Sequence, residues 1–335
     1  MKIEELIIDF QKKMPDLVKE MKASDHHYDI DNLNPYHLES DVWSHTMMVM
    51  LMAREMNSSF IESLACLLHD VGKPMSRLSM DDKKRVGYFG HEGLSCFIAL
   101  NYLNTLDISD EDKIKVLRLI CYHTEIFKLT YNKFNALFKN EDPSFIDSLM
   151  KVSKADSLGR FNLDEGRDFP EVKCTKKEDR EYQATINVLI GPPCSGKSTW
   201  IKENVINETI ISRDDLITEK YPDLSYNEAH NKEKENKGNN SVDSLLHNNL
   251  MKAMKNGEDI VVDMTNCPRK SRQKYLNKKG YLRKATVFLN SYDELMRRNS
   301  LREDKVLNEY VLVKFMKMFY MPLESEFDEI EYVID

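Results

Sequence analysis

The chain has 335 residues, which corresponds to about two domains of ordinary size. Its 48 basic and 56 acidic residues give a net charge of −8, which excludes a strongly cationic nucleic-acid coat protein as a description of the whole chain. An apolar fraction of 41% is enough to form buried cores and excludes global disorder.

Neither a membrane span nor a secretory signal is predicted. No apolar run approaches the roughly 18 residues needed to cross a bilayer, and the first residues lack the cationic-then-apolar order of a signal peptide. The six cysteines form no Cys-x-x-Cys pair, so that neither a disulfide framework nor a zinc knuckle is indicated. We therefore expect a soluble cytoplasmic protein with reduced thiols.

The first part of the chain, from residue 1 to about 170, has a helical pattern. Apolar residues recur every three or four positions, as in Ile114, Leu117 and Ile120, and strand-like alternation is hard to find. We predict an all-α domain over residues 1–175.

Histidine and aspartate residues stand at special positions of these predicted helices. His69 and Asp70 end the apolar helix predicted over residues 61–68, and Asp156 continues an apolar stripe that faces the core. A buried carboxylate needs a strong partner, and a metal ion is a natural one. Mixed imidazole and carboxylate ligands suit the divalent transition metals Mn²⁺, Fe²⁺, Co²⁺, Ni²⁺ and Zn²⁺. The alternative interpretation is a set of core histidines and helix caps with no metal.

Residues 33–160 resemble the HD phosphohydrolase superfamily, and most of all the HD modules that act on RNA ends. The resemblance is carried by the segments 34–37, 41–46, 69–73, 90–92 and 154–160. It implies that Asp70 bridges two ions about 4 Å apart and that Lys73 contacts the substrate phosphate. The implied metal ligands are His45, His69, Asp70, His91, His123 and Asp156. His37 is expected to be structural, and surface positions are expected for His26, His27, His230 and His247.

The sequence pattern changes after a charged stretch with few apolar residues over residues 174–181, which is the predicted linker. Short β-rich runs at 185–190, 209–211, 260–262 and 285–289 alternate with helical stretches. This alternation is typical of an α/β unit with a parallel sheet, and we predict a second domain over residues 183–335.

The first of these β-runs leads directly into a phosphate-binding motif. Residues 191–198 read Gly-Pro-Pro-Cys-Ser-Gly-Lys-Ser, which fits G-x-x-x-x-G-K-[ST] between a strand and a helix. The glycines let backbone N–H groups approach phosphate oxygens, Lys197 is predicted to reach the β- and γ-phosphates, and Ser198 to hold Mg²⁺. The predicted ATP-binding residues are Gly191, Cys194, Ser195, Gly196, Lys197, Ser198 and Thr199.

Two further β-runs end in aspartates, which places these side chains at the ligand-binding edge of an open α/β sheet. Asp214 follows the second run and could accept the proton of an attacking hydroxyl, while Asp263 ends the third run. Arg298 and Arg302 are four residues apart in a predicted helix, so they are expected to share a face and to close over the transferring phosphates. The alternative interpretation is a capped helix start at Asp214 and a solvated arginine face.

Residues 186–320 resemble the phage-type polynucleotide 5′-kinase family. The shared order is the phosphate loop, a strand ending in Ser-Arg-Asp-Asp, a strand ending in Asp-Met-Thr-Asn, and an Arg-Asn-Ser-Leu-Arg lid. The resemblance implies that Asp214 is the general base, that Asp263 lies on the acceptor side, and that Lys197, Arg298 and Arg302 handle the donor phosphates. One position departs from the family, because Ile217 stands where an arginine commonly clamps the acceptor's phosphate.

A strongly basic run over residues 268–284 contains eight basic and no acidic residues. It could follow a nucleic-acid backbone, and a solvated helix face explains it equally well.

The two parts together resemble the bifunctional HD-domain polynucleotide kinases. This implies an enzyme that phosphorylates 5′-hydroxyl ends of RNA or DNA with ATP and removes 2′,3′-cyclic, 2′- or 3′-phosphates from the opposite ends, upstream of a nucleic-acid ligase. Two other classes stay open: a nucleotide-metabolism enzyme that joins an HD nucleotidase to a small-molecule kinase, and a non-enzymatic NTP-gated sensor.

Overall fold

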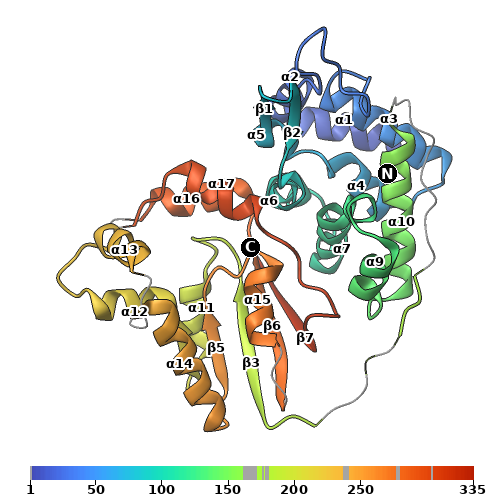
Figure 1. Ribbon diagram of the computed structural model, residues 1–335. Helices are drawn as coiled ribbons and strands as arrows, with labels where there is room; N and C mark the ends of the chain where they lie inside the picture. The colour runs from blue at the N-terminus through green and yellow to red at the C-terminus, as the bar shows by residue number, and fades with distance from the viewer. Residues whose placement is uncertain are drawn as a thin grey trace. The chain divides into compact units, whose positions relative to one another are not determined.

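The computed structural model describes residues 2–160, 172–175, 177, 181–236, 241–276, 280–302 and 305–335 (Figure 1). The chain forms two compact units. The first comprises Met1–Lys177, Ser291–Asp293 and Met316–Ser325, and the second comprises Glu178–Asn290, Glu294–Phe315 and Glu326–Asp335. Part of the predicted linker over residues 174–181 lies outside the described residues.

The first unit is built mainly of helices, as predicted. Its helices are α1 (Ile3–Lys13), α2 (Pro15–Ala23), α3 (Val42–Glu55), α4 (Phe60–Leu68), α5 (Lys73–Ser76), α6 (His91–Leu103), α7 (Asp110–Tyr122), α8 (Glu125–Lys128), α9 (Tyr131–Phe138) and α10 (Pro143–Leu158). It also contains an antiparallel hairpin of β1 (Arg77–Met80) and β2 (Arg85–Tyr88), which the sequence did not predict. These strands are short and mostly solvent-exposed, so they carry no clear apolar alternation.

Helix α4 forms the centre of this unit because its sequence is apolar on nearly every side. A capping box between Ser59 and Glu62 fixes its start, and every residue from Glu62 to Leu68 is buried. Helices α3, α7 and α10 pack against it. The helix ends therefore meet inside the unit, where polar side chains at those ends face one another.

A segment from the C-terminal part of the chain completes the first unit. Phe319 is buried edge-on against Phe97, with ring centroids 4.9 Å apart. The backbone N–H of Met321 donates to the thiol of Cys121 over 3.3 Å. The segment approaches α6 so closely that a Cβ atom at Gly93 would lie 2.5 Å from the Phe319 carbonyl oxygen. Only glycine fits at that position without a backbone shift.

The second unit contains a five-stranded parallel sheet, which confirms the predicted fold class. Its strands are β3 (Ala184–Ile190), β4 (Thr209–Ser212), β5 (Ile260–Asp263), β6 (Tyr281–Leu289) and β7 (Glu329–Ile334), in the order β4-β5-β3-β6-β7. Strand β7 was not among the predicted strands. All four neighbouring pairs are parallel, so their carboxyl ends form one edge of the sheet (Figure 1).

The helices of the second unit connect these strands. They are α11 (Lys197–Asn204), α12 (Arg213–Lys220), α13 (Tyr226–Glu235), α14 (Val242–Lys255), α15 (Arg269–Leu276), α16 (Tyr292–Ser300) and α17 (Glu309–Lys317), of which α16 and α17 each contribute an end to the first unit. Trp200 and Ile201 of α11 pack on Leu189, Val261 and Phe288, which lie on one face of the sheet. Alternation along the strands produces this face.

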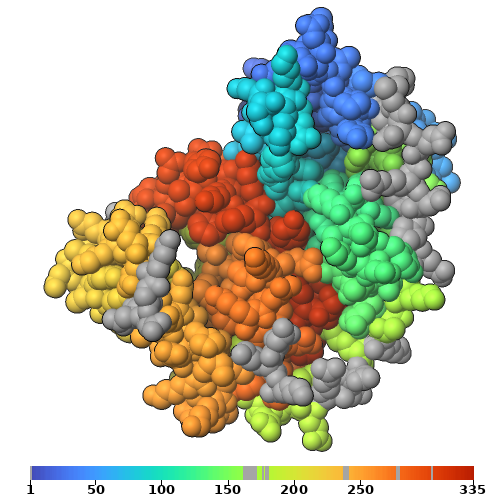
Figure 2. Space-filling model, viewed as in Figure 1, coloured from blue at the N-terminus to red at the C-terminus, as the bar shows by residue number. Residues whose placement is uncertain are grey.

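Helices α16 and α17, drawn in orange-red, lie at the surface in the space-filling view (Figure 2). Between them, Leu301 and Val306 have exposed fractions of 67% and 55%, and Tyr310 near the start of α17 reaches 73%. Within the predicted lid, Leu301 is therefore exposed to solvent, whereas Asn299 is buried.

Three cations of the basic run over residues 268–284 pair with acidic residues near the end of the chain. Arg272 is fully buried and its guanidinium lies 3.0 Å from Glu326. Arg283 forms a salt bridge with Asp328, and the Lys284 ammonium lies 2.8 Å from Glu331. Because these three cations are buried or paired within the fold, neither a nucleic-acid track nor a solvated face describes the whole run. Lys278 and Lys279 lie outside the described residues.

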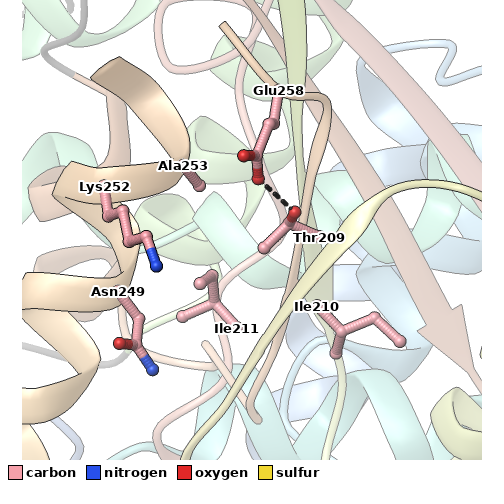
Figure 3. Close-up of a pocket in the computed structure, with 7 residues that line it drawn as sticks. All are labelled: Thr209, Ile210, Ile211, Asn249, Lys252, Ala253 and Glu258. Carbon is pink, nitrogen blue, oxygen red and sulfur yellow. Dashed lines mark hydrogen bonds between the residues drawn. The ribbon is translucent and has the colours of Figure 1, made fainter. Parts of the chain in front are cut away.

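A pocket beside the edge strand β4 is lined by residues of β4 and α14 together with Glu258, which accepts a hydrogen bond of 2.5 Å from the Thr209 hydroxyl (Figure 3). Thr209 begins β4, so this pocket lies toward the amino ends of the strands, away from the edge at which β3 leads into the phosphate loop. It contains none of the predicted site residues. Among the described residues, no helix combines the length and the apolar character needed to cross a membrane.

Candidate active sites

The structure brings the six predicted metal ligands of the first unit together around Asp70, which is fully buried at the end of α4. One carboxylate oxygen of Asp70 lies 3.0 Å from His69 Nε2 and 3.6 Å from His45 Nε2. The other oxygen lies 3.3 Å from His91 Nε2 and 3.9 Å from His123 Nε2. Two groups of possible ligand atoms therefore share Asp70, one with His45 and His69 and the other with His91 and His123.

Three of these histidines are held by the helix ends on which they lie. The Nδ1 atoms of His69, His91 and His123 are 2.7–2.8 Å from the carbonyl oxygens of Cys66, Tyr88 and Ile120. A carbonyl only accepts hydrogen bonds, so each Nδ1 carries the proton and each Nε2 lone pair faces Asp70. Backbone partners of this kind orient metal-ligating histidines in proteins.

Asp156 joins the first of these groups from α10. One of its oxygens is 3.1 Å from His45 Nε2 and 4.0 Å from His69 Nε2. Arg160, one turn further along the same helix, donates to both Asp156 oxygens over 3.2 and 2.5 Å. Arg160 was not among the predicted site residues, although its spacing from Asp156 was visible in the sequence.

Three donor atoms at the centre of the cluster fit divalent cations because they are buried without a hydrogen bond of good geometry among the described residues. They are both carboxylate oxygens of Asp70 and the Nε2 of His91, although the Lys73 ammonium forms an ion pair with Asp70. Burial raises the pKa of Asp70, but the neighbouring His69 and Lys73 outweigh it, so that the pKa lies well below its ordinary range. Burial lowers the pKa of His123 to about 3, and the neighbouring His69 acts in the same direction, which leaves the His123 imidazole neutral at pH 7.

Lys73 also reaches this centre. It is buried at the start of α5, and its ammonium lies 2.6 Å from Asp70 Oδ2 and 5.4 Å from the ring centre of Tyr88. An ammonium at this distance can meet a phosphate oxygen held beside Asp70.

The surface position expected for His26 is wrong. His26 is fully buried, and its ring stacks on that of His37 with centroids 4.3 Å apart. The sequence around it is polar, but a bridge between Asp25 and Asp41 flanks the segment 26–40, and the His26 ring also lies against the rings of His45 and Tyr88. Glu39, in the same segment, lies 3.0 Å from His45 Nδ1 and was not predicted as a site residue.

In the second unit, residues 191–196 form a turn between β3 and α11, as the motif requires. Gly196 has φ = +98° and Cys194 has φ = +68°, a left-handed region that Gly196 adopts without a Cβ penalty. The Lys197 ammonium donates to the carbonyl oxygens of Gly191 and Pro192 over 2.9 and 2.8 Å. Burial lowers the pKa of Lys197. Ser198 and Thr199 are exposed on the first turn of α11.

The two predicted aspartates lie at the carboxyl ends of adjacent strands. Asp263 ends β5 and is in register with Ser212, which ends β4 and caps α12 through a hydrogen bond from the Asp215 N–H. Asp214 is therefore both part of a capped helix start and a residue of the sheet edge. Burial raises the pKa of Asp263, and the negative charges of Asp215 and Asp214 raise it further. The nearby Lys197 ammonium opposes this change but does not outweigh it.

The predicted helix that carries both arginines is shorter than expected. Helix α16 ends at Ser300, so Arg302 lies beyond it. Near this end, the side-chain amide of Asn299 forms two hydrogen bonds of 2.8 and 2.9 Å with the backbone of Leu307. Both arginines still reach the phosphate loop. Arg302 donates to the Cys194 thiol over 3.5 Å, and a Cβ atom at Gly196 would lie 3.4 Å from the Arg298 guanidinium.

Two residues of α13 contact Asp214 and were not predicted from the sequence. The Tyr226 hydroxyl donates to one Asp214 oxygen over 3.0 Å, and His230 Nε2 lies 3.3 Å from the other. The Lys305 ammonium lies 4.0 Å from the centre of the Tyr226 ring. Polar residues twelve and sixteen positions after an aspartate give no sequence signal of contact, because α12 and a turn intervene.

The structure shows the surroundings of Ile217, the position that departs from the kinase pattern. It is fully buried in an apolar cluster with Ala229 and Val242. Its side chain faces α13 and α14 and is not available to a phosphate.

Both parts of the chain match known protein families. Residues 42–179 match the HD domain family, and residues 186–321 match the AAA domain family. The multifunctional CCA protein of Psychromonas ingrahamii (strain DSM 17664 / CCUG 51855 / 37) is 27% identical over 142 residues, which cover 40% of this chain and 34% of that protein. The chain thus spans about a third of the length of this curated relative.

Two of the solved structures that match this chain each cover less than half of it. A chain from the structure of the Pnkp1/Rnl/Hen1 complex is 20% identical and covers 39% of this chain and 43% of that one, with a TM-score of 0.29. A gluconokinase from Sinorhizobium meliloti 1021 is 18% identical and covers 46% of this chain and 84% of that one, with a TM-score of 0.30. Similarity this low does not indicate a substrate. The chain joins an HD domain to a P-loop domain that matches the AAA domain family.

Proposed function

We propose that the protein is a bifunctional enzyme that heals broken nucleic-acid ends. The observation that carries the proposal is that one chain combines a histidine–aspartate cluster centred on Asp70 with a phosphate loop beside the carboxylate of Asp214. The first arrangement suits phosphoester hydrolysis and the second suits phosphoryl transfer to a hydroxyl. A broken strand with a 2′,3′-cyclic or 3′-phosphate and a 5′-hydroxyl needs both reactions before ligation.

In the kinase reaction, the 5′-hydroxyl oxygen attacks the γ-phosphorus of ATP, and ADP leaves. Asp214 takes the hydroxyl proton, and it has a side-chain exposed fraction of 55%, so that an acceptor can reach it from solvent. Lys197 and Arg302, which both contact the phosphate loop, would offset the charge that develops on the transferred phosphoryl group. Ser198, exposed on the first turn of α11, would hold Mg²⁺.

In the phosphoesterase reaction, the residues around Asp70 would hold one or two divalent cations, which supply Lewis acidity and lower the pKa of water when bound. Lys73 would contact a phosphate oxygen of the substrate, since its ammonium lies beside Asp70 within the cluster. Arg160 keeps Asp156 oriented toward His45 and His69.

The test is a 5′-hydroxyl, 3′-phosphate oligonucleotide incubated with ATP and either Mn²⁺ or Mg²⁺, with both termini analysed. We expect the protein to add the 5′-phosphate and to remove the 3′-phosphate. Lys197→Ala should abolish only the first change and Asp70→Ala only the second. Lys202→Ala, exposed on the same helix as Lys197, and Asp107→Ala, in an exposed turn, serve as matched controls. If Lys197→Ala leaves 5′-phosphorylation intact, the assignment of the phosphate loop is wrong.

A second candidate function is nucleotide metabolism, with an HD nucleotidase joined to a small-molecule kinase. The observation that favours it is Ile217, whose burial removes the acceptor-phosphate clamp expected of a polynucleotide kinase. Mononucleosides and oligonucleotides compared as acceptors at equal concentration separate the two functions. Faster phosphorylation of a mononucleoside would support this second candidate.

A further inference from the structure

A second group of metal-ligand residues lies in the segment that precedes α3, outside the six predicted ligands. A nitrogen of His26, a nitrogen of His37 and a carboxylate oxygen of Glu39 lie within 4.8 Å of one another. His37 Nδ1 is 2.7 Å from Glu39 Oε1, and the stacked rings of His26 and His37 hold their edges side by side. Glu39 has a side-chain exposed fraction of 3%, so that this carboxylate is largely removed from water.

His26 provides the main evidence for a ligand in this group. Its side chain is fully buried, and among the described residues neither Nδ1 nor Nε2 has a hydrogen-bond partner. Buried polar atoms in proteins nearly always have partners, so two unpartnered nitrogens on one ring need an explanation. The ring is enclosed by other rings, because it stacks on His37 and lies edge-on to Tyr88 with centroids 5.5 Å apart, and the His26 N–H donates to the Ser40 carbonyl over 2.6 Å.

The charges select the kind of ligand. A buried carboxylate beside two imidazoles repels an anion such as phosphate and attracts a cation. Two imidazoles with one carboxylate are also a common ligand set for zinc and other divalent transition metals. Glu39 Oε1 is at the same time 3.0 Å from His45 Nδ1, so that one carboxylate connects this group to a predicted ligand of the Asp70 cluster.

We propose that His26, His37 and Glu39 hold a further divalent transition-metal ion, distinct from any ion bound by the Asp70 cluster. Glu39 then has two tasks, since it is a ligand of this ion and orients His45. The site does not depend on which reaction the HD domain catalyses.

Cobalt binding by the full chain tests the proposal. The protein is stripped with a chelator, loaded with Co²⁺, desalted, and its cobalt content per chain is measured. We expect His26→Gln to bind one equivalent less than the wild type. His247→Gln, the same substitution on an exposed face of α14, should bind as much as the wild type. Equal cobalt content in the wild type and His26→Gln overturns the proposal.

An Asp70→Asn background separates this site from the Asp70 cluster. Asp70→Asn is expected to keep one equivalent of cobalt, and the added His26→Gln should remove it. If Asp70→Asn loses phosphoesterase activity but the double variant binds as much cobalt as the single one, the further site is absent while the proposed function stands. Glu39→Gln, which keeps the side-chain volume, tests the same loss if His26→Gln does not fold, and circular dichroism establishes folding for each variant.

Discussion

Acid should destabilise the metal-free first unit, because it buries several histidines in the neutral form. Burial lowers the pKa of His37 to about 3, assisted by the nearby Lys73 ammonium, and burial lowers the pKa of His123 to about 3 as well. In the unfolded chain these imidazoles titrate near pH 6.5. Between about pH 6.5 and 3 the unfolded state therefore binds more protons, so the free energy of unfolding falls as the pH falls.

The magnitude follows from the linkage relation. Each histidine contributes up to about 1.4 kcal/mol per pH unit, so the two together reduce the free energy of unfolding by about 3 kcal/mol between pH 6.5 and 5. His26, whose pKa burial lowers further, acts in the same direction. The pKa of His45 is raised, because the hydrogen bonds to Asp156 and Glu39 outweigh its burial, and this affects stability only above pH 6.5.

Tryptophan fluorescence can follow the first unit alone. The chain has two tryptophans, and Trp43 is buried in α3 of the first unit while Trp200 belongs to the second. Urea unfolding of a Trp200→Phe variant with EDTA, at pH 6.5 and 5, measures the predicted change. His123→Gln should reduce the pH dependence by about a third, because His26 and His37 contribute similar amounts. A free energy of unfolding that is equal at the two pH values would refute this reasoning.

Three further outcomes are expected from contacts in the second unit. Tyr226→Phe removes the hydroxyl that donates to Asp214 and should lower the kinase kcat by about 3- to 10-fold. This corresponds to about 1 kcal/mol for a hydrogen bond to a charged group, because Asp214 is half-exposed. An unchanged kcat would argue against the contact. Glu326→Ala leaves the buried guanidinium of Arg272 without its bidentate partner and should destabilise the second unit by about 3 kcal/mol, measured by urea unfolding of a Trp43→Phe variant through Trp200. Ile217→Arg should lower the unfolding midpoint in the same assay rather than improve acceptor binding, since it places a charge in an apolar cluster; a stable variant with a lower KM for oligonucleotides would contradict this.

Elements with a strong local pattern were predictable from the sequence. The phosphate loop is one example, because the spacing of Gly191, Gly196 and Lys197 is dictated by a turn of fixed length between a strand and a helix. The four predicted strands of the sheet are another, since each is a short apolar run followed by a helical stretch. The β1–β2 hairpin was missed because its strands are exposed, and β7 was missed although it pairs with β6 over six residues.

The histidine and aspartate residues of the first unit were predictable as a set, and their contacts were not. His69 and His123 stand where helices end, a feature that the apolar pattern of the preceding residues indicates. The sharing of Asp70 by two groups depends on how α3, α4, α6 and α7 pack. The burial of His26, in a polar segment without periodicity, accompanies tertiary contacts of its ring with His45 and Tyr88.

The sequence by itself determined the two kinds of unit and the turn of the phosphate loop, and it predicted a set of candidate site residues, because turns, helix ends and apolar periodicity are set by residues within a few positions of one another. Only the tertiary structure decided that Tyr226 and His230 meet Asp214, that Glu326 neutralises Arg272 across 54 positions, and that Met316–Ser325 completes the first unit. Such contacts depend on the packing of whole helices and strands, and a linear pattern carries no record of which distant faces meet.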